Sequence, residues 1–166
     1  MHQWDRRVGE RETSVGPPDG VNQRVVDEFM STGAVIAGSG TFEPAGGWGG
    51  DHHAGVPIYV VCRHPAPAWA ADWPLVHYVS DLQAAVRDAK AAAGDKNVLM
   101  HGAGTAQRAL VAGLLDEIEI HLIPVLLGQG RSLFEHVGVQ QRELERTRVL
   151  EGEGGVTHLH FRVSHR

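Results

Sequence analysis

Short apolar runs alternate with helical patterns along most of the chain. Apolar runs of strand length, together with one stretch that alternates polar and apolar positions, predict strands. These strands are expected at 34–37, 57–62, 76–79, 97–100 and 117–123. Apolar residues at helical spacing predict helices, with Asn22 and Asp81 as caps of the first two. These helices are expected at 22–31, 81–93 and 105–115.

The two ends of the chain differ from this alternation. Residues 1–21 are polar and rich in Gly and Pro, which is typical of a loop or arm. Residues 143–149 and 156–163 predict a β-hairpin across a Gly-rich turn. Strands separated by helices and followed by a hairpin favour an α/β fold with a mostly parallel sheet. We therefore expect an N-terminal arm, residues 1–21, and a single domain over residues 22–166.

Composition limits the classes of partner. The 166 residues carry a formal net charge of -5 and no long basic run, so nucleic acid is not the expected partner. No apolar stretch has the length of a membrane span, and the first residues lack the apolar core of a signal peptide. Cys62 is the single cysteine and is expected to be a buried, reduced thiol. These features predict a reduced, soluble, cytoplasmic protein.

Two Gly-rich turns follow predicted strands and lead into helical segments. The first turn is Gly38-Ser39-Gly40-Thr41, and the second is Gly102-Ala103-Gly104-Thr105. Glycines allow the backbone to approach a phosphate, and the N–H groups at a helix start favour an anion. Neither turn completes G-x-G-x-x-G, because Glu43 and Gln107 occupy the third glycine position. Two such turns at the same ends of neighbouring strands would lie where open α/β sheets bind ligands.

Other chemistry has weaker support. The eleven histidines include the pair His52-His53 and the motif His158-x-His160, but no Cys pair or carboxylate at ligand spacing accompanies them, so no metal is predicted. The chain contains no G-x-S-x-G motif, so the sequence does not indicate a hydrolase. Trp48 lies in a Gly-rich loop, where it could either stack on a planar substrate or pack back onto the core.

Several segments resemble one known family in order and spacing. Residues 34–42 resemble the pattern G-A-V-(V/I)-x-G-(R/K)-x-T-(F/Y) of the dihydrofolate-reductase-like superfamily. Residues 46–57 (G-G-W-G-G-D through G-V-P) and 112–130 (A-G-L-L-D-E-I-E-I-H-L-I-P-V-L-L-G-Q-G) are similar to one branch of it. That branch is named for the C-terminal reductase domain of the bacterial riboflavin-biosynthesis deaminase–reductase, and this chain resembles its stand-alone members.

The resemblance implies a fold, an activity and a set of binding residues. The fold is a mixed, mostly parallel sheet flanked by helices, with antiparallel C-terminal strands. The activity is reduction of a pteridine- or pyrimidine-like heterocycle by NADPH or NADH, as in 5-amino-6-(5-phosphoribosylamino)uracil reductase or dihydrofolate reductase, with homodimers common. The stacking position of Trp48 in its Gly-rich loop makes it the expected substrate-binding residue, and the catalytic residue stays unassigned. The implied cofactor-binding residues are Gly38, Ser39, Gly40, Thr41, Arg63, Gly102, Ala103, Gly104 and Thr105.

Three departures from the family pattern support an alternative. Ser39 replaces the usual Arg or Lys and so lacks a charge for a phosphate. His101 replaces the first glycine of the second turn. Nothing in residues 1–21 predicts the family's first, apolar strand, which we expect either to lie upstream, to be replaced by another segment or subunit, or to be lost. A non-catalytic, dimeric ligand-binding relative of the same fold is therefore the alternative prediction.

Overall fold

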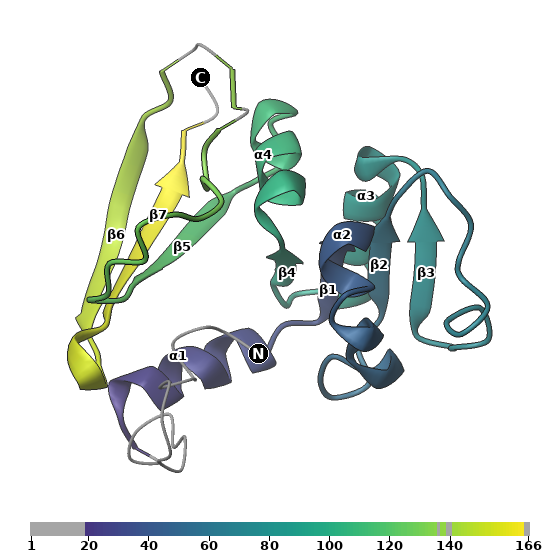
Figure 1. The fold of residues 1–166 in the computed structure, drawn as a ribbon, viewed down its shortest axis with the longest axis horizontal. Coiled ribbons are helices and arrows are strands. Elements are labelled where there is room, and N and C mark those ends of the chain that lie inside the picture. Colours follow the sequence, from purple (N-terminus) through teal and green to yellow (C-terminus); the bar gives the residue numbers. More distant parts are fainter. Residues whose placement is uncertain (1–18, 136, 139–140, 165–166) are drawn as a thin grey trace. The chain divides into compact units, whose positions relative to one another are not determined.

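The computed structural model describes residues 19–135, 137–138 and 141–164, which form two compact units. We call them the parallel unit (residues 29–115, 132–135 and 137–138) and the antiparallel unit (residues 19–28, 116–131 and 141–164), after their sheets (Figure 1). Each is described by itself. The prediction that residues 1–21 form an arm concerns mostly residues outside the described ones, as does the expected absence of a first strand. The prediction of one domain over residues 22–166 stays a prediction.

The parallel unit contains a four-stranded parallel sheet in the order β3-β2-β1-β4. Its strands are β1 (Ala34–Gly38), β2 (Ile58–Val61), β3 (Val76–Val79) and β4 (Val98–His101). Its helices are α2 (Ser39–Phe42), the 3-10 helix η2 (Gly46–Gly50), α3 (Leu82–Ala93) and α4 (Ala103–Val111). Asp81 caps α3 as predicted, since its carboxylate accepts from the Gln83 backbone N–H at 2.9 Å.

Both faces of this sheet are covered. Successive side chains of a strand point to opposite faces. Ala34 and Ile36 therefore pack on α3, while Val35 and Ala37 pack with Phe42 of α2 on the other face. These four residues of β1 are fully buried. Burial on both faces explains why the strand is continuously apolar.

The antiparallel unit contains a three-stranded sheet in the order β5-β7-β6. Its strands are β5 (Glu117–Leu122), β6 (Leu144–Glu151) and β7 (Thr157–Val163), and a short 3-10 helix, η3 (Glu153–Gly155), joins the last two. The predicted hairpin is thus confirmed. The unit also contains helix α1 (Val21–Met30) up to residue 28.

The predicted α/β fold class, with a parallel sheet flanked by helices and antiparallel C-terminal strands, is confirmed, and three local predictions need correction. Asn22 does not cap α1: Glu153 accepts from the backbone N–H groups of Val21 and Asn22 at 2.8 and 2.9 Å instead. Helix α4 runs from Ala103 to Val111 rather than over 105–115, since Gly113 adopts a φ of 68° that a helix cannot continue. Cys62 is half-buried rather than buried.

No helix among the described residues is both long enough and apolar enough to cross a bilayer.

Candidate functional site

The two Gly-rich turns begin side by side in the parallel unit. Strands β1 and β4 pair in parallel, with Ala37 opposite His101. Each strand ends at the same edge of the sheet, and each turn follows directly. The strand register therefore confirms the prediction that both turns lie at the same edge of the sheet.

Two of the four turn glycines are needed to pack the turns against each other. Gly102 has a φ of 92°, and a Cβ there would collide with Thr41 Oγ1. A Cβ on Gly38 would lie 2.8 Å from Thr105 Oγ1, and Thr105 is only 3% exposed. The threonine of each turn thus lies against the glycine of the other, and the two turns form one interlocked surface.

The other two turn glycines face open space. A Cβ on Gly40 or Gly104 would meet no atom within 4 Å, so the backbone is accessible at both positions. No side chain caps the N-terminus of α4, whose first internal hydrogen bonds run from Thr105 and Ala106 to the Gly102 carbonyl. Neither turn contains a carboxylate. Accessible N–H groups and the absence of negative charge suit an anionic ligand.

The remaining residues of the predicted cofactor site occupy different surroundings. Ser39 and Ala103 are half-buried within the turns. Arg63 is exposed and lies two residues beyond Val61, which pairs with Gly38 across β1 and β2. Arg63 thus follows the neighbouring strand at the same edge. Gln107, which replaces the third glycine of the motif, is buried and donates to the carbonyls of Ser132 and Leu133 at 3.2 and 2.9 Å.

Trp48 lies in a loop of unusual backbone geometry. Gly47, Trp48 and Gly49 all have positive φ values, between 51° and 68°, a region that a tryptophan rarely adopts. The Trp48 ring packs edge-on against Phe42 with centroids 5.4 Å apart, so it contacts the core. A Cβ on Gly47 would come within 2.9 Å of Phe42, which explains the small residue beside it. The predicted role of Trp48 in substrate binding remains a prediction.

Three histidines from two segments form a row next to these turns. His101 Nε2 lies 3.0 Å from His52 Nε2, and His52 Nδ1 lies 2.7 Å from His53 Nδ1. His53 Nε2 lies 3.1 Å from the Thr32 carbonyl oxygen. Trp48 contacts the row, with its ring centroid 4.7 Å from that of His52 and 5.4 Å from that of His101. All three imidazoles are half-buried.

Hydrogen-bond chemistry fixes the direction of this row when the rings are neutral. A backbone carbonyl only accepts, so His53 carries its proton on Nε2. The Thr32 hydroxyl agrees, because it donates to the Phe29 carbonyl at 2.7 Å and must accept from His53 at 3.2 Å. His53 Nδ1 then accepts from His52 Nδ1, and His52 Nε2 accepts from His101 Nε2. The lone pair of neutral His101 is therefore on Nδ1.

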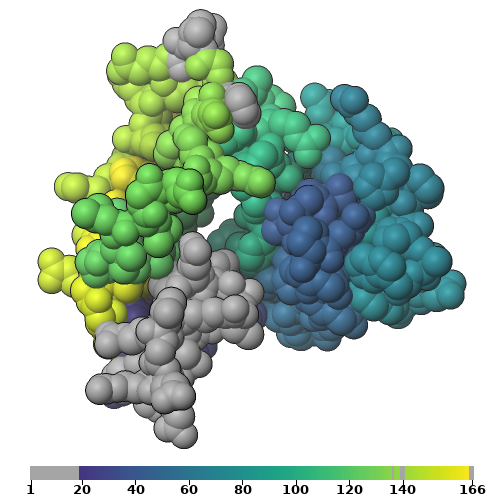
Figure 2. Space-filling model, viewed as in Figure 1, coloured from purple at the N-terminus to yellow at the C-terminus, as the bar shows by residue number. Residues whose placement is uncertain are grey.

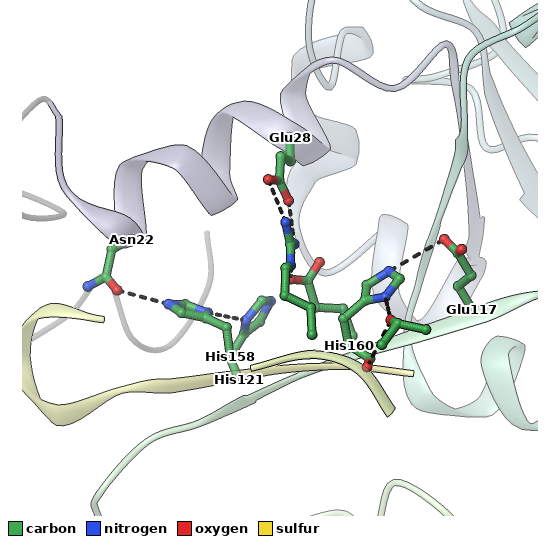
Figure 3. A network of polar contacts seen from close by, with 9 residues as sticks. Asn22, Glu28, Glu117, His121, His158 and His160 are labelled. Atoms are coloured by element: carbon green, nitrogen blue, oxygen red, sulfur yellow. Dashed lines mark hydrogen bonds and ion pairs between the residues drawn. The ribbon is translucent and has the colours of Figure 1, made fainter. Parts of the chain in front are cut away.

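A second group of histidines lies in the antiparallel unit (Figure 3). His158, which is 1% exposed, lies 2.9 Å from Asn22 Oδ1 through Nε2 and 2.7 Å from His121 Nδ1 through its own Nδ1. His160 Nε2 lies 3.4 Å from Glu117 Oε2. Asn22 Nδ2 donates to the Glu153 carbonyl at 3.1 Å, so Asn22 Oδ1 is the acceptor for His158.

Charged side chains complete this second group. Arg148 makes a two-pronged ion pair with Glu28 and lies 3.4 Å from Glu119. The hydrogen bonds from Arg148 lower the pKa of Glu28. Burial raises the pKa of Glu119 despite the same guanidinium. Burial also lowers the pKa of His158, assisted by the positive charge of Arg148. The neutral form of His158 is therefore favoured.

Tyr78, in the parallel unit, also has a shifted pKa. Burial raises the pKa of Tyr78 to about 12, and the carboxylate of Glu43, which accepts from the Tyr78 hydroxyl at 3.2 Å, adds to the effect. Tyr78 therefore keeps its proton at neutral pH and donates it in the hydrogen bond to Glu43.

Sequence reasoning missed the row of His101, His52 and His53. The sequence offers His52-His53 as a metal pair or a hydrogen-bonded pair, and His101 as a departure from a glycine that could reach a phosphate. Their contact joins residues 49 positions apart, and no local pattern signals it. In the part of the chain that the structure describes, no group of three His, Cys, Asp or Glu side chains has a geometry that could hold a metal ion.

Comparison with known proteins identifies related folds. Residues 3–157 match the model of the RibD C-terminal domain family. The fold is similar to a putative riboflavin biosynthesis protein from Shewanella sp. PV-4, at a TM-score of 0.70 and 21% identity, covering 90% of this chain and 84% of that one. It is also similar to a pyrimidine reductase-like protein from Corynebacterium diphtheriae, at a TM-score of 0.65 and 14% identity, covering 91% and 84%.

A longer protein shares the fold as well. A diaminohydroxyphosphoribosylaminopyrimidine deaminase/5-amino-6-(5-phosphoribosylamino)uracil reductase from Thermotoga maritima matches with a TM-score of 0.63 and 12% identity. The match covers 86% of this chain and 48% of that protein. No curated protein sequence matched the chain.

Proposed function

The chain belongs to the RibD C-terminal domain family, and from this premise we propose that it is an NAD(P)H-dependent reductase of a small heterocyclic substrate. The observation that carries the proposal is the interlocked pair of Gly-rich turns at adjacent strand ends. Two glycines hold the turns together, while Gly40 and Gly104 leave the backbone open. Such a surface fits the phosphates of a dinucleotide.

The residues present fit this cofactor. The backbone N–H groups at the start of α4 and around Gly40 would hold the diphosphate, and the Thr41 and Ser39 hydroxyls are polar neighbours. Arg63, exposed at the end of β2, would bind the additional phosphate that distinguishes NADPH from NADH. When bound, the cofactor supplies a hydride. The chain's own contribution is to orient it and to exclude water from the reacting atoms.

The proposed substrate class is a pyrimidine related to riboflavin synthesis. The Thermotoga protein is named as a 5-amino-6-(5-phosphoribosylamino)uracil reductase, and this compound is therefore the first substrate to test. The Trp48 loop, which reaches from the core to the His101 row, would cover the heterocycle.

The position that tests the cofactor site is Gly104. Gly102 is unsuitable, because its positive φ and its contact with Thr41 mean that a side chain there would disturb the turn itself. Gly104 has open space, so Gly104→Val should leave the fold intact and occupy the room needed by a phosphate. The matched control is Ala91→Val, at an exposed position of α3.

The measurement is calorimetric titration of the full chain with NADPH and with NADH. We expect wild type and Ala91→Val to bind NADPH with a Kd of about 1–100 μM, typical of enzyme ligands. Gly104→Val should weaken binding roughly tenfold or more, the equivalent of one or two lost hydrogen bonds. Equal affinities of Gly104→Val and wild type would remove the turns from the binding site. Absence of binding by wild type would favour the non-catalytic alternative.

We also propose that the chain forms a homodimer. Apolar side chains at the end of β5 and directly after it are strongly exposed, and the green segment in Figure 2 that contains them forms part of the surface. They are Leu122 at 59%, Val125 at 60%, Leu126 at 101% and Leu127 at 65%. An exposed apolar cluster of this kind marks an interaction surface. Sedimentation equilibrium should give twice the chain mass for wild type and the monomer mass for Leu126→Asp.

A further inference from the structure

We propose that His101 is the proton donor of the reduction, acting through Nδ1, and that His52 and His53 are positioning residues that fix its tautomer. The inference rests on the proposed reductase function and adds the acid that this function requires. It is carried by the geometry of the histidine row and by its place beside the turn that begins at Gly102.

The first step of the argument is the direction of the row. Three hydrogen bonds of 2.7 to 3.1 Å lead from His101 through His52 and His53 to the Thr32 carbonyl. The carbonyl at the end accepts only, so each neutral ring donates toward Thr32. His101 therefore keeps its Nε2 proton in the row and exchanges protons at Nδ1. A neighbouring group that accepts from one ring nitrogen sets which nitrogen takes part in the chemistry.

The second step is the protonated state. When His101 takes up a proton at Nδ1, its Nε2–H still donates to His52, and the bond becomes charge-assisted. His52 thus stabilises the imidazolium as well as its orientation. Trp48 contacts both rings, with centroids 4.7 and 5.4 Å from its own.

The third step is location. His101 is the last residue of β4, and Gly102, the first residue of the proposed cofactor turn, follows it directly. Trp48, the residue proposed to cover the substrate, contacts His101. The strained backbone of the Trp48 loop costs energy that the surrounding contacts must offset, and such strain is concentrated at functional sites.

Few ionisable side chains lie on the elements that pack against β4. β1, beside β4, carries no ionisable side chain, and Asp51 in the loop accepts from the Gly55 backbone N–H at 3.2 Å. The ionisable side chains of α3 and α4, which also pack on β4, are Arg87, Asp88, Lys90 and Arg108.

The chemical step balances with the groups named. A carbon–heteroatom double bond of the substrate accepts a hydride from NAD(P)H at carbon, and its oxygen or nitrogen takes the Nδ1 proton of the His101 imidazolium. The π bond breaks, one C–H and one O–H or N–H bond form, and oxidised NAD(P)+ and neutral His101 remain. Solvent returns a proton to His101 for the next cycle.

The row itself is tested by nitrogen NMR of the full, uniformly labelled chain without ligand. We expect His52 to carry its proton on Nδ1, whereas His53 and His101 carry theirs on Nε2. The His52 tautomer is diagnostic, because the Nε2–H form usually prevails in water. His52→Gln keeps an acceptor for His101 and should preserve the His101 tautomer, while His52→Phe should give a mixture. An Nε2–H tautomer of wild-type His52 would overturn the assigned direction.

The catalytic role is tested with NADPH and 5-amino-6-(5-phosphoribosylamino)uracil. We expect kcat to fall as pH rises through the pKa of His101 in wild type, and His101→Asn to lower kcat about 100-fold or more and to lose this pH dependence. NADPH affinity should change less than threefold. His52→Phe should lower kcat, and His52→Gln should restore most of it. The exposed His77→Phe is the control.

The outcomes separate the two proposals. Wild-type binding and turnover, with an unchanged pH profile in His101→Asn, would overturn the proton-donor role and leave the reductase function standing. Absence of NADPH binding or of turnover in wild type would overturn the reductase function and the donor role together. The NMR result on the ligand-free chain would still decide whether the histidine row exists.

Discussion

The two histidine groups of this chain use the same chemistry in different surroundings. In the antiparallel unit, His158 is 1% exposed and is held between Asn22 and His121 (Figure 3). In the parallel unit, His101, His52 and His53 are half-buried and end at a backbone carbonyl. Hydrogen bonds fix the direction of both groups. Of the two, the row of His101, His52 and His53 is the one that lies beside an accessible turn.

This difference separates a structural role from a chemical one. A fully buried histidine with a lowered pKa is held neutral, and its hydrogen bonds mainly satisfy buried polar atoms. A half-buried histidine can exchange protons with water or with a ligand. We therefore expect changes in the His158 group to affect stability and changes in the His101 row to affect activity.

The largest expected effect is the loss of stability in His158→Ala. The substitution leaves a cavity and removes the donor to Asn22 Oδ1, which is itself buried. We expect the free energy of unfolding to fall by about 2–4 kcal/mol, combining cavity formation and an unsatisfied polar group. Urea denaturation followed by circular dichroism measures it. A loss below about 1 kcal/mol would contradict the structural role assigned to this row.

The second prediction concerns pH. Because the pKa of folded His158 lies below its ordinary value of 6.5, the unfolded chain binds a proton before the folded chain does as pH falls. The contribution of His158 to stability is therefore complete above pH 6.5. It decreases as the pH falls from there toward the lowered pKa of the folded state. The contribution of Glu28, whose pKa is also lowered, is lost only below its ordinary value of 4.5. The pH range in which the Glu28 contribution is lost therefore lies below the range of pH 5.5–6.5, in which the His158 contribution decreases.

Urea midpoints measured across this range distinguish His158 from the carboxylates. The decrease between pH 6.5 and 5.5 should be smaller in His158→Ala than in wild type, whereas the exposed His77→Gln should leave it unchanged. An identical pH slope in His158→Ala and wild type would show that another group causes it.

The smallest expected effect on stability is that of His53→Gln. The ring is half-buried, and the glutamine amide can still donate to the Thr32 carbonyl. We expect the free energy of unfolding to change by less than about 0.5 kcal/mol, while kcat falls. A stability loss as large as that of His158→Ala would mean that both rows are structural and would remove the contrast between the units.

Much of the local structure was predictable from residue patterns. The strand at 76–79 was predicted with its observed bounds, and the helix that follows the Asp81 cap ends at Ala93 as predicted, since apolar periodicity and the Asp81 cap are local signals. The prediction for the start of α1 was wrong in one respect. Asn22 is a residue type that often caps helices. The Glu153 carboxylate, 132 residues away from Val21, caps α1 instead by accepting from the Val21 N–H.

The turns illustrate the limit of sequence reasoning about the candidate site. Glycine, strand and helix patterns located both turns, but they could not separate the glycines by role. In the folded unit Gly38 and Gly102 lie against threonines of the opposite turn, whereas Gly40 and Gly104 face open space. That distinction depends on the pairing of β1 with β4.

The sequence by itself determined the α/β fold class, the family and the location of the two turns, because all three rest on local patterns and segment order. The tertiary structure alone decided which histidines meet. Contacts between His101 and His52, and between His158 and Asn22, join residues 49 and 136 positions apart. Such contacts depend on strand register and loop geometry, which no short segment specifies, and the proposed proton donor emerges only at this level.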